Sequence, residues 1–371
     1  MKGAVPSLLV VAGESSADRY AAAVLARLRD RMPDARFFGL GLERLSREGL
    51  ECVADVSELG VVGITEAFSA VGAAFGILKV LSDKVKKYRP SAALLVDLPS
   101  FNLHLAQRLR RMGVGVVWYV APQLWAWRTG RIRKLRRRVD RLCVVLPFEE
   151  EFFRKAGIDA RYVGHPLVEF QRAGKPERPY LVLLLPGSRN AEIERMLEPM
   201  VAAAGLLGKR HPHLRFVCAP AIEPSRRWFD ELCSRHRAKV ELAVGEADRL
   251  LCTAGLAWCA SGTISLQAAM AGVPQVVVYR LSWLSWLVAN AMVKVPWASL
   301  VNILAGRQLV PELLQGNFTP ESLASHSEVL LWGPERARVT EGYRQVRAML
   351  GSRNASDAVA DTVLEVMNAG R

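Results

Sequence analysis

The stretch YLVLLLPGSRNAEI, residues 180–193, decides how the rest of the chain is interpreted. Its first half is a run of apolar, partly β-branched residues long enough for a buried strand, which breaks at a Pro-Gly pair before a helical pattern begins. Backbone N–H groups and the positive end of a helix dipole collect in such a turn, so it can hold a phosphate or diphosphate. Ser188 and Arg189 lie in the turn, and Arg189 is either a bidentate phosphate partner or a solvated surface charge.

The composition indicates a globular chain with room for more than one domain. It has 371 residues, of which 51% are hydrophobic and 23% charged, so disorder is not expected. The length fits two domains of ordinary size. The six cysteines form no CxxC pair, which favours a reducing compartment, and the N-terminal residues lack the pattern of a secretory signal.

The chain is basic. Its 50 Lys and Arg residues against 36 Asp and Glu residues give a formal net charge of +14. Such a charge favours an anionic partner, which is nucleic acid, a phosphorylated metabolite or an acidic membrane surface. Because the sequence shows no RRM, zinc-finger or helix-turn-helix pattern, we do not expect nucleic acid to be the partner.

Two predicted strands in the N-terminal half lead into carboxylates. Glu14 follows a strand over Ser7–Ala12, and Asp97 ends a strand over Ala92–Asp97. Open α/β sheets bind ligands at this end of their strands, where Asp97 can take a proton from a substrate hydroxyl. The alternatives are that Glu14 only stabilises the dipole of the next helix, over Ala17–Met32, and that Asp97 caps the helix after it.

The expected helix caps favour a functional role for both carboxylates. Ser15 or Ser16 can cap the first helix, and Asn102, near which the second helix is expected to begin, can cap the second. Capping is then done by other residues.

The stretch LGVVGITEAFSAVGAAFGILKVL, residues 59–81, is strongly apolar, but Glu66 and its glycines argue against a transmembrane helix. We expect a loop and then an amphipathic helix from about Thr65. Its apolar side either packs into the core or lies in a membrane interface. That side comprises Phe68, Val71, Phe75, Leu78 and Val80 or Leu81.

An aromatic segment and a basic run follow another strand. The segment YVAPQLWAW, residues 119–127, contains Trp125 and Trp127, and the basic run after it is expected on a largely exposed helix. Such runs are usually solvated, but nothing acidic interrupts this one before Asp140, so a footprint for lipid phosphates is a competing interpretation. The run comprises Arg128, Arg131, Arg133, Lys134, Arg136, Arg137, Arg138 and Arg141.

A polar, proline-containing segment over 169–179 is expected to link two α/β domains. His165 precedes it, either as a ligand contact at the hinge or as a hydrogen-bonded structural histidine. The predicted parts are an N-terminal domain over 1–168, a C-terminal domain over 180–335, and helices in 336–371 that pack on the N-terminal domain or are exchanged in a dimer.

The second domain repeats the strand–helix alternation. A strand over Leu256–Ala260 runs into Ser261-Gly262-Thr263, a second strand–turn–helix with hydroxyls in the turn. The two turns together could hold a diphosphate, and Gln267, one helical turn later, would face the ribose. The strands are expected at Tyr180–Leu185, Arg215–Ala219, Val240–Ala243, Leu256–Ala260 and Gln275–Tyr279.

Nine segments, in this order over nearly the whole chain, carry a family resemblance. They are AGESSAD, VVGITEAF, VDLPSFNLHLA, YVAPQLWAWR, LPFEEEFF, YVGHPL, LLPGSRNAEI, ASGTISLQAAMAGVP and SLVNILAGRQLVPELLQ. Together they resemble the lipid-A-disaccharide synthase family, glycosyltransferase family 19. The resemblance implies the α/β GT-B architecture, with two Rossmann-like domains and the active site in the interdomain cleft. It also implies a cytoplasmic enzyme, peripheral on the inner face of the inner membrane, that forms dimers by exchanging C-terminal segments.

The resemblance implies a reaction of lipid A and lipopolysaccharide biosynthesis that needs no cofactor or metal. The 6-hydroxyl of 2,3-diacylglucosamine 1-phosphate (lipid X) would attack the anomeric carbon of UDP-2,3-diacylglucosamine with inversion, giving a β-1,6-linked disaccharide and UDP. Asp97, in the segment matching the family's DxPxFN, is the expected base, and Glu14 is the other candidate carboxylate.

The remaining site residues follow from the same correspondence. The residues expected to bind the UDP donor are Ser16, Ser188, Arg189, Ser261, Gly262, Thr263, Gln267, Asn302 and Gln315. Because both substrates carry acyl chains, the residues expected to face the acceptor and an anionic membrane are Phe68, Phe75, Trp125, Trp127, Arg128 and Arg131.

Several positions depart from the family pattern. Ala17, Ala21 and Leu42 replace glycines, Val301 replaces a proline, and Gln267 stands where the family has glutamate. A methyl at position 17 could crowd a ligand or forbid a positive φ, and Gln267 is a weaker acceptor than a carboxylate. Two alternatives stay open: a related GT-B enzyme on another UDP-sugar, such as the peptidoglycan GlcNAc transferase or a UDP-GlcNAc epimerase, and a non-catalytic lipid- or nucleotide-binding homologue. DLPSFN and WAWR together argue against the first.

Overall fold

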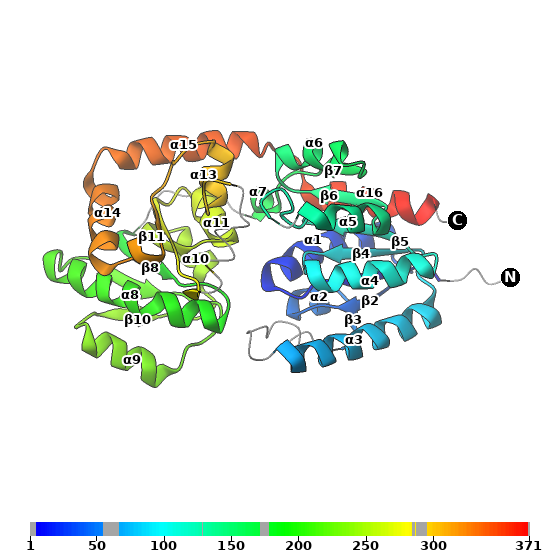
Figure 1. Cartoon of the computed structure of the whole chain (residues 1–371), viewed down its shortest axis with the longest axis horizontal. Helices are drawn as coiled ribbons and strands as arrows, with labels where there is room; N and C mark the ends of the chain where they lie inside the picture. The colour runs from blue at the N-terminus through cyan, green and yellow to red at the C-terminus, as the bar shows by residue number, and fades with distance from the viewer. Residues whose placement is uncertain are drawn as a thin grey trace. The chain divides into compact units, whose positions relative to one another are not determined.

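The computed structural model describes residues 5–54, 67–127, 129–170, 178–283, 286 and 295–369. The chain divides into two compact units, of which the first comprises Met1–Pro166 with Ser352–Arg371 and the second Leu167–Gly351. Each unit contains one parallel sheet with helices packed on it, as Figure 1 shows. The boundary lies just before the segment that the sequence predicts as a linker, of which residues 171–177 are outside the described chain.

The sheet of the first unit has seven strands in the order β3-β2-β1-β4-β5-β6-β7, and every pair is parallel. β1 and β4 are buried along their whole length, as expected for strands covered on both faces. The strand order reverses between β1 and β4, which is the point where open α/β sheets bind ligands. The strands are β1 (Ser7–Val11), β2 (Arg36–Leu40), β3 (Glu51–Cys52), β4 (Ala92–Val96), β5 (Gly115–Tyr119), β6 (Arg141–Val144) and β7 (Ala160–Tyr162).

Helices connect these strands and close the core on both faces of the sheet. Phe38, Trp118 and Phe153 are fully buried in one cluster. The helices are α1 (Ser15–Arg31), α2 (Glu43–Arg47), α3 (Ala67–Tyr88), α4 (Pro99–Arg111), α5 (Ile132–Arg138), α6 (Pro147–Lys155) and α7 (Pro166–Phe170), the last containing the boundary between the units.

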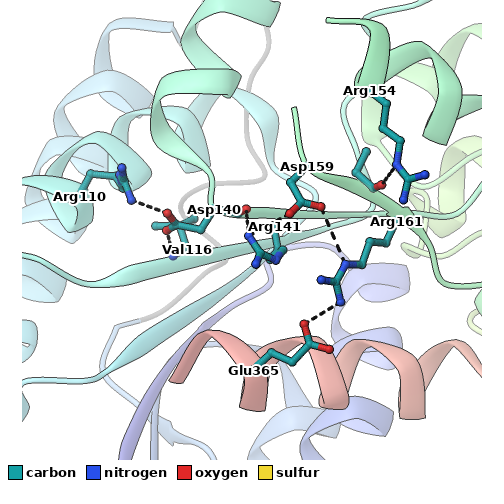
Figure 2. Close-up of polar contacts among 9 residues, drawn as sticks. Arg110, Val116, Asp140, Arg141, Arg154, Asp159, Arg161 and Glu365 are labelled. Carbon is teal, nitrogen blue, oxygen red and sulfur yellow. Dashed lines mark hydrogen bonds and ion pairs between the residues drawn. The ribbon is translucent and has the colours of Figure 1, made fainter. Parts of the chain in front are cut away.

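The last helix, α16 (Ala355–Ala369), returns to the first unit, where it contacts α1, β4 and β5. Ion pairs fix it there: Arg27 Nε lies 3.1 Å from an Asp357 oxygen, and Arg161 Nη1 lies 2.6 Å from Glu365 Oε2. Figure 2 shows Arg161 between Asp159 and Glu365. The predicted C-terminal segment 336–371 is therefore divided, because α15 (Glu335–Met349) belongs to the second unit.

The sheet of the second unit has six parallel strands in the order β10-β9-β8-β11-β12-β13, and its order reverses between β8 and β11. The strands are β8 (Arg178–Leu185), β9 (Arg215–Cys218), β10 (Val240–Leu242), β11 (Ala254–Ala260), β12 (Gln275–Tyr279) and β13 (Glu312–Leu314). The helices besides α15 are α8 (Asn190–Arg210), α9 (Arg226–Arg235), α10 (Ala247–Leu251), α11 (Thr263–Ala271), α13 (Leu300–Ala305) and α14 (Pro320–Trp332). The five strands predicted for this domain are confirmed, and β13 was not predicted.

No helix within the described ranges has both the length and the apolar character needed to cross a bilayer.

Candidate active-site residues at the carboxyl edges of the sheets

Glu14 and Asp97 follow the two strands between which the order of the first sheet reverses. β1 and β4 pair in register, with Val11 opposite Leu95, so the residues that follow them leave the same edge of the sheet side by side. Both carboxylate residues are partly exposed. The first-unit edge, defined as the residues that directly follow β1, β4, β5 and β6, therefore carries the two predicted catalytic candidates at its ligand-binding point.

The backbone of the first-unit edge is strained. Asp97, Leu98 and Val120 have φ angles of +51°, +45° and +63°, in the left-handed region that side chains with a Cβ rarely adopt. Each such residue costs about 1–3 kcal/mol and persists only where its surroundings hold it. The Asp97 N–H donates to the Tyr119 carbonyl at 3.1 Å, and the Val120 N–H donates to the Cys143 carbonyl at 3.1 Å.

The predicted caps of the two adjoining helices are wrong. α1 begins at Ser15, so Ser15 and Ser16 lie in its first turn, and its N-cap residue Glu14 makes no side-chain cap. α4 begins at Pro99, with Leu98 as the N-cap residue and again no side-chain cap, so Asn102 lies inside the helix. The sequence pattern misplaced these helix starts because Ser and Asn are preferred at caps, whereas the N-cap residue is Glu14 in α1 and Leu98, in the strained turn, in α4.

Asp18 and Ala17 have structural explanations. The Asp18 carboxylate is 2% exposed and accepts hydrogen bonds from the N–H groups of Leu42 at 2.6 Å and Arg44 at 3.0 Å, so it caps α2. Ala17 lies within α1, and Leu42 has a φ of −100°. The expectation that Ala17 forbids a needed positive φ is therefore wrong, and the geometry at Leu42 does not require glycine.

Glu149 ties the aromatic segment to α6. Its Oε1 accepts a hydrogen bond from Trp125 Nε1 at 2.9 Å, and its Oε2 accepts from the N–H of Leu146 at 3.0 Å. Burial raises the pKa of the Glu149 carboxyl to about 7. Trp125 also meets the Phe148 ring edge-on at 5.0 Å, whereas Trp127 is 39% exposed. Sequence reasoning missed Glu149, although a glutamate three residues after the N-cap residue, here Leu146, is a known capping signal.

The basic run is only partly a solvated face. Arg138 is half-buried and donates to the Leu103 carbonyl at 2.9 Å, and Arg131 Nη1 donates to Ser100 Oγ at 3.3 Å in the first turn of α4. Arg131 thus contacts the start of the helix that follows β4, while Arg128 is outside the described residues. The members exposed on α5 are Arg133, Lys134, Arg136 and Arg137.

The predicted apolar side of α3 divides between core and surface. Leu78 and Leu81 are buried in the core, whereas Phe75 is 59% exposed. The Phe68 side chain and residues 55–66 are outside the described part of the chain. Val80 is also exposed, at 40%, so Phe75 and Val80 are the described large apolar side chains of α3 that are candidate membrane contacts.

The turns after β8 and β11 flank the reversal point of the second sheet. α8 and α11 start there without side-chain caps, at Arg189 and Gly262 respectively. Arg189 is 59% exposed, and its Nη1 lies 3.7 Å from Glu192 Oε1. Gly262 has a φ of +153°, which favours glycine, and Thr263 beside it is exposed. Uncapped helix starts offer backbone N–H groups to an anion.

Three other predicted donor-site residues bond within the second unit, two of them through their side chains. Ser188 keeps an exposed hydroxyl, but its N–H donates to Glu192 Oε2 at 3.2 Å. The Ser261 hydroxyl donates to the Ala298 carbonyl at 2.8 Å. Gln267 is 7% exposed, and its amide donates to an Asp248 oxygen. Contacts of Ser261 and Gln267 with a nucleotide therefore remain predictions, and their side chains already stabilise the turn.

The side-chain amides of Asn302 and Gln315 differ in how fully they are hydrogen-bonded. Asn302 is fully buried and its amide makes four hydrogen bonds, to the backbone of residues 309–310 and to Glu312 Oε1. Gln315 directly follows β13, has a φ of +51°, and its Nε2 is buried without a hydrogen-bond partner among the described residues. A buried unpaired donor in a strained backbone is typical of a ligand contact.

His165 is buried one residue before the end of the first unit. Burial lowers the pKa of its imidazole to about 3, so the ring is neutral at physiological pH. Gly164, with a φ of +95°, packs directly against the Arg353 backbone, which fixes this segment. This favours the structural interpretation of His165 over the ligand contact.

The described residues contain no group of three or more His, Cys, Asp or Glu side chains arranged to hold a metal ion.

Comparisons with known proteins identify the family of the chain. A family model described as lipid-A-disaccharide synthetase matches residues 8–364. The lipid-A-disaccharide synthase of Myxococcus xanthus is 42% identical over 383 residues, covering 99% of both chains, and that of Anaeromyxobacter sp. strain K is 43% identical over 373 residues, covering 97% of both.

Solved structures show the fold. A UDP-GlcNAc 2-epimerase from Neisseria meningitidis bound to UDP-GlcNAc superposes with a TM-score of 0.63 at 13% identity, covering 97% of this chain and 99% of that one. The calicheamicin glycosyltransferase CalG4 gives 0.61 at 16% identity and covers 99% of both chains. The predicted pair of Rossmann-like domains is thereby confirmed. The chain belongs to the lipid-A-disaccharide synthase family of glycosyltransferases, which acts in lipid A biosynthesis.

Proposed function

We propose that this chain joins UDP-2,3-diacylglucosamine to 2,3-diacylglucosamine 1-phosphate with inversion at the anomeric carbon, forming a β-1,6-linked disaccharide and UDP. The observation that carries the proposal is the position of Asp97, in a strained turn beside the reversal point of the first sheet, in a chain of this family. Strained residues at such a point are typical of catalytic groups.

In the proposed mechanism Asp97 is the general base. Its carboxylate takes the proton from the acceptor 6-hydroxyl while the oxygen attacks the anomeric carbon and the bond to the UDP oxygen breaks. Glu14, which leaves the same edge beside it, is the second carboxylate and orients the acceptor. Arg131 binds the acceptor phosphate, because its guanidinium lies near the start of α4.

The second unit binds the donor. Arg189 and the backbone N–H groups at the uncapped starts of α8 and α11 stabilise the charge that develops on UDP. Gln315 donates its Nε2 to the nucleotide sugar. Two proteins of this fold were solved with UDP-GlcNAc and with UDP and glucose bound, which supports nucleotide binding by this chain.

Turnover with and without Asp97 tests the reaction. Purified protein in mixed micelles is expected to convert the two substrates to disaccharide and UDP, and Asp97→Asn is expected to lower kcat by about 10²–10⁴-fold. Asp83→Asn, which removes an exposed carboxylate of α3, is the control and leaves kcat unchanged. Glu14→Gln shows which carboxylate limits the rate. If the folded wild type binds UDP but forms no disaccharide, the proposal is wrong.

We also propose that the enzyme is cytoplasmic, binds the membrane peripherally through α3, and forms a homodimer with exchanged C-terminal segments. Phe75→Glu is expected to weaken binding to phosphatidylglycerol-containing vesicles about tenfold, because Phe75 is the most exposed large apolar side chain among the described residues of α3. Met112→Glu alters another exposed apolar residue of the first unit and serves as control. Equal loss in both variants would refute the role of α3, and light scattering gives the oligomeric state.

A further inference from the structure

Asn102 contacts the turn that carries Asp97. We propose that Asn102 is a positioning residue, which holds the Asp97 peptide in its left-handed conformation and thereby sets the position of the Asp97 carboxylate for proton transfer. The inference rests on the proposed function, in which Asp97 is the base.

Three consecutive carbonyl groups are held by this one residue. Asn102 is 0% exposed, and its Nδ2 donates to the Asp97 carbonyl oxygen at 2.7 Å and to the Val96 carbonyl oxygen at 3.4 Å. Its backbone N–H donates to the Leu98 carbonyl oxygen at 2.9 Å. Because Asp97 and Leu98 are the two consecutive left-handed residues, Asn102 holds both strained residues of the turn as well as the end of β4.

Stability alone does not explain an amide at this position. The Oδ1 of Asn102 is buried and accepts no hydrogen bond from any residue in the described ranges, which is unfavourable. The two carbonyl acceptors identify the donating atom as nitrogen, so exchanging the two amide atoms does not remove the conflict. An apolar side chain with a relaxed turn would avoid both the unpaired oxygen and the left-handed residues.

The strained backbone explains why a stabilising contact from Asn102 is needed. Left-handed conformations are unfavourable for residues with a Cβ, so without the Nδ2 contact Asp97 and Leu98 relax toward other backbone angles. The direction of the Asp97 side chain changes with its φ. A displacement of a catalytic group by about 1 Å lowers the rate by roughly 100-fold.

The test compares two substitutions of Leu98 in an Asn102→Ala background. Asn102→Ala is expected to lower kcat by about 10- to 100-fold, with KM for each substrate changed by less than about threefold. Adding Leu98→Gly is expected to recover part of kcat, because glycine adopts a positive φ without strain. Adding Leu98→Ala removes the same side-chain contacts without that freedom and is expected to recover none. If Asn102→Ala does not fold, Asn102→Asp retains the side-chain shape and loses the amide donor.

The outcomes separate the inference from the proposed function. Selective recovery by Leu98→Gly supports the positioning role. An unchanged kcat in folded Asn102→Ala, or equal effects of the two Leu98 substitutions, overturns it while disaccharide synthesis by the wild type and its loss in Asp97→Asn still stand. If the wild type makes no disaccharide, the proposed function fails first.

Discussion

Asn102 in the first unit and Asn302 in the second are both completely buried, yet their amides are used in opposite ways. The Asn302 amide makes four hydrogen bonds and leaves no atom unpaired. The Asn102 amide has an unpaired oxygen within the described chain and contacts a strained turn. Burial of a polar residue therefore does not distinguish stability from function, whereas hydrogen-bond satisfaction and backbone strain do.

The distribution of strain extends this contrast. Within the described ranges six non-glycine residues have a positive φ. Arg89 and Arg237 follow helices, where the left-handed conformation is common. The other four directly follow a strand, at the edge where ligands bind: Asp97, Leu98, Val120 and Gln315.

Removing the Asn302 amide should have the largest effect on stability. Asn302→Ala leaves two backbone N–H groups without their partner and removes one of the two donors to Glu312 Oε1, so we expect the free energy of unfolding to fall by about 3–5 kcal/mol. Hydrogen exchange of peptides around residues 298–312, together with urea denaturation, measures the loss.

Asn317→Ala is the matched control, because Asn317 is exposed in the same segment, and it should change the free energy of unfolding by less than about 0.5 kcal/mol. The contrast between the two buried asparagines fails if Asn102→Ala destabilises the first unit as strongly as Asn302→Ala destabilises the second.

Glu149 tests the contrast between the two buried asparagines with a different side chain. Like the Asn302 amide, its carboxylate has a hydrogen-bond partner for every polar atom. Because its pKa is about 7 when folded and 4.5 when unfolded, the folded state binds the proton more tightly. Its contribution to the free energy of unfolding is therefore fully present below about pH 4.5 and is lost as pH rises to about 7, by up to about 3 kcal/mol. In Glu149→Gln this dependence disappears, which unfolding curves between pH 5 and pH 8 can measure.

Glu151→Gln provides a control of opposite sign. Lys155, 2.6 Å from this exposed carboxylate, lowers the pKa of Glu151, so its small contribution to stability is lost as pH falls. The same pH dependence in wild type and Glu149→Gln would show that Glu149 does not titrate with folding.

Much of this architecture could be predicted from the sequence. The apolar runs before Glu14, Asp97, Pro186 and Ser261 predicted strands at the correct places, because buried parallel strands read as continuous apolar segments. β2, β3 and β13 were not predicted, and strand length is not the reason in every case, since β2 is as long as β1 and β4. The sequence also placed the candidate carboxylates at strand ends.

The roles of individual polar residues could not be predicted. Asn102 has the sequence properties of a cap, and only its coordinates show that it lies inside α4 and bonds backward to the strained turn. Asp18 was known only as part of a motif, and its role as cap of α2 depends on a contact between separate helices. Such contacts are tertiary, and local sequence preferences do not encode them.

Substitution of Gln315 has the smallest expected effect on stability. It also tests most directly whether a left-handed backbone marks a ligand contact. If its left-handed backbone and buried Nε2 serve the donor, Gln315→Gly keeps the conformation without strain but loses the donor atom. The free energy of unfolding should then change by no more than about 1 kcal/mol, while the Kd for UDP rises about tenfold. Arg237→Gly relieves an equally left-handed residue after α9 and should leave UDP binding unchanged in calorimetry. Unchanged UDP binding in both variants would mean that the left-handed backbone after β13 belongs to the turn and does not serve donor binding. Backbone strain would then accompany a functional residue at the first-unit edge alone.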